Sequence, residues 1–172
     1  MAWLRTALTA ALIFTAVLLQ LTVLPLLRLP GSTPDLVAVT VIALGFAAGP
    51  VRGAAAGFVA GLVLDLVPPA DGLIGLSAVV LVVLGYLAGL LGRPDRSPFV
   101  SVALTALLSA GVVLGFAMVG GIVGDPRVSW DRVPMLLLTQ AGYALVLAPF
   151  VVPVVGALWR RVDPPAPRYE RV

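Results

Sequence analysis

The sequence predicts an all-α, polytopic membrane protein with six transmembrane helices. Of its 172 residues, 60% are apolar and only 11% are charged, and the mean hydropathy is +1.12. Soluble domains contain about 45–50% apolar and about 25% charged residues, so a soluble fold of this size could not bury so much apolar surface. The apolar runs do not alternate with polar residues as barrel strands do, and backbone groups in lipid must be satisfied within each segment. The spans are therefore expected to be helices.

The apolar runs follow one another at residues 6–27, 36–49, 53–67, 73–91, 99–124 and 133–158. The first run is too long for the core of a signal peptide and lacks a cleavage site, so we expect a retained span. Segments rich in Pro, Gly and charge separate most runs, and Pro98 and Pro134 are typical of the first turn of a helix. Residues 1–159 are expected to form one transmembrane domain, followed by a short Pro/Arg-rich cytoplasmic tail at 160–172.

The second and third runs are short, at 14 and 15 residues, whereas a span typically needs about 20. Residues 36–67 could instead form one fused helix or a re-entrant hairpin. Both alternatives place Arg52 inside the membrane, at a cost of roughly 3 kcal/mol or more. Two separate spans put eight arginines on the side of the N-terminus and three on the other. The positive-inside rule then favours six spans with both termini in the cytoplasm.

The composition excludes several kinds of chemistry. The sequence contains no Cys, His, Lys or Asn, and all eleven basic residues are Arg. Disulfides, Cys or His metal sites, Ser–His catalysis and Schiff-base chemistry are therefore excluded, and we expect neither enzyme activity, a metal nor a cofactor. An aspartyl pair could arise only from Asp35, Asp65 and Asp71, which lie on the same predicted side. The arginines are scattered between apolar runs, so the basic pI does not indicate nucleic-acid binding.

A regular glycine pattern marks the third run. Gly49, Gly53, Gly57 and Gly61 recur every four residues, and a further pair occurs at Gly85 and Gly89. Residues four apart lie on one face of an α-helix, and small residues there let another helix approach closely in lipid. The stripe is interpreted as a helix-packing seam within the molecule or as a docking face for a partner's helix.

Two acidic residues lie at the edges of apolar runs. Asp35 immediately precedes the second run and is predicted to cap the N-terminus of its helix. Asp65 lies within GLVLDLVPP, near the end of the third run. It could be a hydrated helix-end carboxylate, a partner of Arg28 or Arg127, an interhelical contact, or part of a ligand or partner site.

The segment from Pro34 to Gly89 contains PDL, GPVRG, GFVAGLVLDL, GLIGLSA and GYLAG in this order. It resembles the rod-shape-determining MreD family over about a third of the chain, with Asp35 and Asp65 at the family's PDL and LLLDL elements. The loop at 68–71 departs from the family pattern, so nothing is carried over to Asp71.

The resemblance implies a non-enzymatic scaffold in the bacterial inner membrane, within the machinery for cell elongation and peptidoglycan synthesis. It implies binding to the bitopic protein MreC, in a lipid environment, and indirect links to MreB filaments and a RodA-type wall synthase.

The MreD family also resembles, in architecture, the substrate-binding subunits of energy-coupling-factor transporters. A small-molecule-binding transporter subunit is therefore the alternative function. Such a carrier needs convergent polar groups near mid-membrane. The candidates are few, namely Gln20, Thr22, Tyr86, Gln140 and Tyr143. These groups could equally bond across helices, so the sequence favours the scaffold.

Overall fold

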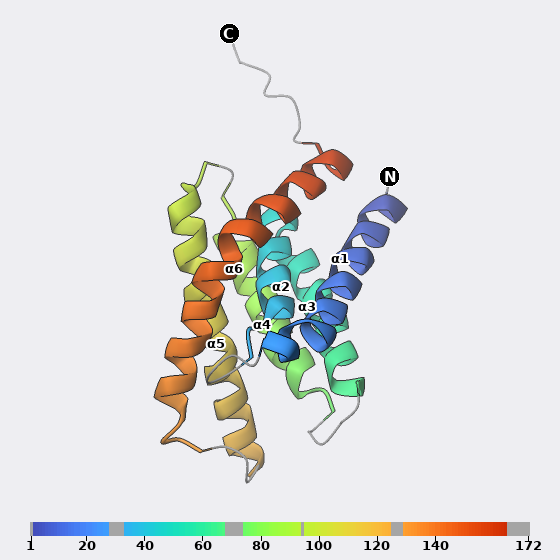
Figure 1. The fold of residues 1–172 in the computed structure, drawn as a ribbon. Helices are drawn as coiled ribbons and strands as arrows, with labels where there is room; N and C mark the ends of the chain where they lie inside the picture. Colours follow the sequence, from blue (N-terminus) through green and yellow to red (C-terminus); the bar gives the residue numbers. More distant parts are fainter. Residues whose placement is uncertain (1, 28–32, 68–73, 94, 125–128, 165–172) are drawn as a thin grey trace.

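The computed structural model describes residues 2–27, 33–67, 74–93, 95–124 and 129–164, and in these residues it confirms an all-α fold (Figure 1). No strand occurs in the described part of the chain. The helices are α1 (Ala2–Thr22), the 3-10 helix η1 (Leu24–Leu27), α2 (Leu36–Ala48), α3 (Pro50–Leu66), α4 (Leu76–Leu91), α5 (Pro98–Val123) and α6 (Val133–Val162).

In the described part of the chain, three helical segments are long and apolar enough to cross a membrane: Trp3–Leu26, Pro98–Val123 and Val133–Val162. The other helices are shorter, since α2, α3 and α4 contain 13, 17 and 16 residues. At 1.5 Å per residue, α2 and α4 measure roughly 20 and 24 Å, which is less than the hydrocarbon thickness of about 30 Å. The described residues therefore have the helix composition of a membrane protein, with three long apolar helices and three shorter ones.

Two helix ends differ from the apolar runs. The first run extends to Leu27, but α1 ends at Thr22 and is followed by η1, because Pro25 lacks an N–H and disfavours helix in the residue before it. At the other end of the chain, α6 continues past residue 159 to Val162. Its last turn carries Arg160 and Arg161, and cations stabilise the negative end of a helix dipole.

The helix α2 occupies the centre of the bundle and contacts each of the other five α-helices. Its residues Val37 to Gly45 are all buried, so no face of this helix meets lipid or water. Its sequence, LVAVTVIALGFAA, is apolar on every face, as expected of a buried helix. Its one polar side chain, Thr40, donates its hydroxyl to the carbonyl oxygen of Leu36 at 2.8 Å.

A single residue, Gly49, connects α2 to α3 and reverses the chain. Its φ of +88° lies in a region that side chains disfavour. The N–H of Gly49 donates to Gly45 at the end of α2, and the carbonyl of Gly49 accepts from Gly53 at the start of α3, both at 2.9 Å. Residues 36–67 therefore form two helices, and the fused-helix alternative is wrong.

Successive helices run in alternating directions between two ends of the bundle. At one end, Arg5 of α1 and Arg52 of α3 both meet Asp163, which follows α6. We call this the arginine end, and it lies at the top of Figure 1. At the opposite end, Gln20 near the end of α1 bonds to Val37 at the start of α2. The C-terminal part of α6, drawn in red in Figure 1, crosses the bundle toward α1. The end of α6 therefore lies near the start of α1.

Candidate functional site

The glycine stripe of α3 lies directly against the backbone of α4. A Cβ atom added to Gly57 would lie 2.5 Å from the carbonyl carbon of Leu81, and one added to Gly61 would lie 2.5 Å from the carbonyl carbon of Ser77. Real Cβ atoms do not approach other heavy atoms so closely. Only glycine therefore allows these two helices to pack at this separation.

The helix α2 joins the same seam near the arginine end. A Cβ on Gly45 would lie 2.7 Å from the carbonyl oxygen of Gly85, and one on Gly53 would lie 2.8 Å from the Cα of Gly45. Gly89 of α4 lies against Pro50 at the start of α3. Glycines from α2, α3 and α4 thus meet at one point. The helix α4 covers Gly53, Gly57 and Gly61 of the stripe that the sequence also offered as a docking face, whereas Gly49 forms the turn before α3, where an added Cβ would meet no other atom.

Asp65 caps the N-terminus of α4 from the end of α3. One carboxylate oxygen accepts from the backbone N–H groups of Gly75 at 2.8 Å and Ala78 at 3.4 Å, and the other accepts from Ser77 at 3.3 Å. The N-cap residue of α4 is Gly75, which has no side chain to perform this role. An acid at the positive end of a helix is electrostatically favourable. Asp65 therefore makes an interhelical contact, one of the alternatives given by the sequence.

The sequence offers Arg28 and Arg127 as partners of Asp65, and Asp71 as a member of a possible aspartyl pair. All three lie outside the described residues.

The N-terminus of α2 is capped by two side chains. Asp35 is its N-cap residue and accepts from the N–H of Ala38 at 2.8 Å. The side-chain oxygen of Gln20, on α1, accepts from the N–H of Val37 at 2.8 Å. Because α2 is buried, an unsatisfied N–H group there would cost several kcal/mol. The bond to Gln20 therefore attaches the first helix to the core.

An ion-pair cluster lies at the arginine end. Asp163 accepts from Arg5 at 2.8 Å and from Arg52 at 3.1 Å, using a different carboxylate oxygen for each. The guanidinium carbon of Arg52 also lies 5.7 Å from the centre of the Trp159 ring, a cation–π distance. One carboxylate thereby connects the ends of α1, α3 and α6.

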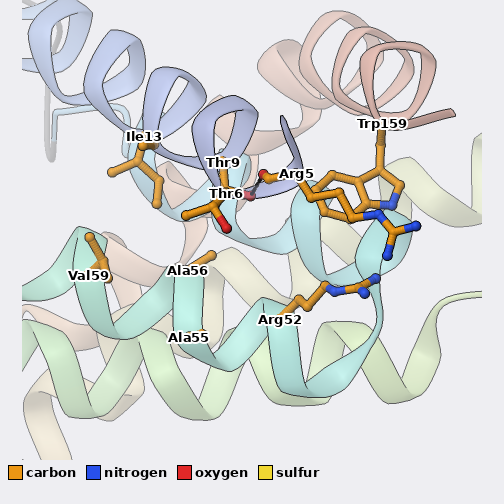
Figure 2. Close-up of a pocket in the computed structure, with 10 residues that line it drawn as sticks. Arg5, Thr6, Thr9, Ile13, Arg52, Ala55, Ala56, Val59 and Trp159 are labelled. Atoms are coloured by element: carbon orange, nitrogen blue, oxygen red, sulfur yellow. Dashed lines mark hydrogen bonds between the residues drawn. The ribbon is translucent and has the colours of Figure 1, made fainter. Parts of the chain in front are cut away.

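A cavity of about 400 Å³ lies beside this cluster, between α1 and α3 (Figure 2). In Figure 2 the guanidinium groups of Arg5 and Arg52 lie on the same side of the cavity, next to Trp159. The described residues that line the cavity offer cations from Arg5 and Arg52 and hydroxyls from Thr6 and Thr9. Its chemistry suits the binding of an anion.

The sequence reasoning did not identify this cluster as a site. It interpreted Arg5 and Arg52, like the other arginines, as topology signals, and it placed Asp163 in the cytoplasmic tail. The available signal was that Asp163 is the first acid after the last apolar run, on the same predicted side as both arginines. Lying on the same predicted side of the membrane does not by itself bring two residues into contact.

The close packing at Gly57 predicts the effect of enlarging this residue. Gly57→Leu places four carbon atoms where the α4 backbone lies, so the helices must separate. Overpacking of this kind costs about 1–3 kcal/mol or more. We expect a lower melting temperature and lower folded yield in detergent. Val63→Leu, at a side chain that is 37% exposed on the same helix, is the matched control and should behave as wild type. Equal stability of both variants would contradict the seam.

The three bonds to Asp65 predict a graded series. Asp65→Ala leaves the three amides at the start of α4 without their acceptor and should cost on the order of 1–3 kcal/mol. Asp65→Asn keeps one oxygen for Gly75 and Ala78, so its loss should be smaller. Hydrogen exchange measured at residues 75–78 should accelerate most in the Ala variant. Asp131→Ala, at an exposed acid, is the control. Unchanged protection in Asp65→Ala would contradict the cap.

Comparisons with known proteins assign neither a family nor a function to this chain. No protein-family model, no curated protein and no solved structure matches the chain. The functional interpretation therefore depends on the residues and contacts described above.

Proposed function

We propose that this protein is a scaffold subunit of the bacterial cell-elongation machinery, similar to the MreD family. One observation supports this most: the segment that resembles the family, residues 34–89, covers the core helices α2, α3 and α4. Its motif residues Asp35, Gly53, Asp65 and Gly85 make the caps and close contacts of that core. The resemblance thus falls on the residues that hold the helices together.

A scaffold also fits the use of four polar groups near the ends of the apolar segments. Asp35, Asp65 and Gln20 bond to helix N-termini, and Thr22 bonds to the preceding turn of its own helix. A carrier would instead direct such groups toward a ligand near mid-membrane. Because α4 covers the glycine stripe, we propose that the bitopic partner MreC binds a different, outward-facing helix surface.

We further propose that all six helices cross the bacterial inner membrane, with the arginine end and both chain termini in the cytoplasm. The alternating helix directions and the eight-to-three distribution of arginines support this topology.

This topology predicts the labelling of single cysteines, which the chain permits because it contains none. A cysteine replacing Val51, which is 77% exposed beside Gly49, should react with a membrane-impermeant maleimide only from the cytoplasm. A cysteine replacing Asp131, exposed before α6, should react only from outside. Reaction of both positions from the same side would contradict six spans, and no reaction at position 51 from either side would support the re-entrant hairpin.

The scaffold function predicts the identity of the partners. The tagged chain, purified in mild detergent, should co-purify with an MreC-like bitopic protein, and its depletion should make rod-shaped cells round. Val63→Leu should restore cell shape, whereas Gly57→Leu should restore it poorly because its core is destabilised. Co-purification with a pair of ATPases, with normal cell shape on depletion, would contradict the scaffold and support the transporter subunit.

A further inference from the structure

We infer that the cavity between α1 and α3 binds an anionic phospholipid, with the lipid phosphate at Arg5 and Arg52 and an acyl chain between the two helices. This inference does not depend on the proposed scaffold function, but it rests on the proposed position of the arginine end at a membrane surface. It is based on the charge of the cluster, the shape of the cavity and its position at the ends of the helices.

The cluster carries more positive charge and more donors than Asp163 can satisfy. Two guanidinium groups face one carboxylate, which leaves a net charge of +1 among these three side chains. Each guanidinium has five N–H donors, whereas the ion pairs use one nitrogen from each. The Nε atom of Arg5 is buried and makes no hydrogen bond to any described residue. A phosphate offers several charged acceptor oxygens and suits such paired guanidiniums.

The cavity changes from cationic to apolar along the two helices. From α1 it is lined by Arg5, Thr6, Thr9, Ala10 and Ile13, and from α3 by Arg52, Ala55, Ala56 and Val59. At 1.5 Å per residue, the α1 wall extends about 12 Å from the first of these residues to the last. Small alanines on both helices keep the slot open, and Figure 2 shows two of them, Ala55 and Ala56, on α3. An inorganic phosphate would fill the cationic end only, whereas a lipid fills both parts.

The position of the cavity also fits a lipid headgroup. The helices α1 and α3 both begin here, so the positive ends of their dipoles point toward the cluster. Trp159, which forms part of the wall, is a residue type enriched at the membrane–water interface. A headgroup at the interface and an acyl chain extending into the hydrocarbon would therefore occupy their normal depths.

The experiment is a lipid titration of the purified full-length chain, followed by native mass spectrometry. Phosphatidylglycerol and phosphatidylcholine with identical acyl chains are the probes. Wild type should prefer phosphatidylglycerol, and Arg5→Gln or Arg52→Gln should reduce this preference about fivefold, the effect of one cationic side chain near an anionic surface. Arg160→Gln removes the same charge from an exposed position outside the cavity, and it should leave the preference unchanged. An equal loss in all three variants would overturn a specific site.

Asp163→Asn separates lipid binding from a purely structural role of the arginines. It breaks the same ion pairs as the arginine variants but raises the net charge of the cluster. The preference for phosphatidylglycerol should therefore increase, whereas a structural ion pair predicts that it falls as in Arg5→Gln. A fall in Asp163→Asn would overturn the inference.

Two further measurements identify the source of the phosphate. Ala55→Phe fills the apolar part of the slot without changing charge, and it should weaken binding of phosphatidylglycerol. Glycerol 3-phosphate, which has the phosphate but no acyl chain, should bind much more weakly than the lipid. If glycerol 3-phosphate binds as well as the lipid and Ala55→Phe has no effect, the cavity binds a soluble phosphate and the lipid inference is overturned.

Discussion

The close contact between the backbones of α3 and α4 is the constraint on which the rest of this structure depends. Lipid is as apolar as the helix surfaces, so it does not drive helices together, and association must come from close packing. Gly57 and Gly61 allow this packing because they carry no Cβ atom. The resulting short separation brings Asp65 within reach of the start of α4. It also leaves α2 enclosed, with the chain reversing at Gly49.

The elements of this fold could be predicted from the sequence because each has a local cause. Apolar runs in a chain with few charges indicate helices, and Asp35 before such a run indicates a cap. The four-residue spacing of glycines also defines one face of a helix. The spacing does not say which helix lies against that face, because periodicity describes a single element. The choice of α4 depends on the turn before it, where Gly75 adopts a φ of +98° and presents its N–H to Asp65.

The arginine end shows the opposite case, in which local patterns place residues on one side but do not bring them together. Arg52 and Asp163 are 111 positions apart, and their contact depends on how α6 crosses the bundle. Each residue has an ordinary interpretation on its own, as a topology signal or a tail residue. The cavity results from three helix ends that converge with small side chains between them. No spacing within one helix encodes such a site, so it could not be predicted from the sequence.

The bridge through Asp163 also has a consequence for biogenesis. Arg5 belongs to the first helix of the chain and Asp163 follows the last, so their ion pair cannot form until α6 has been synthesised and inserted. During that interval α1 is attached to the core through the bond of Gln20, at the other end of the bundle, and through buried side chains such as Ile13 and Val17. The start of α1 is thus fixed by this ion pair only after the rest of the described bundle has been made. A lipid phosphate beside Arg5 would balance its charge while the remaining helices assemble.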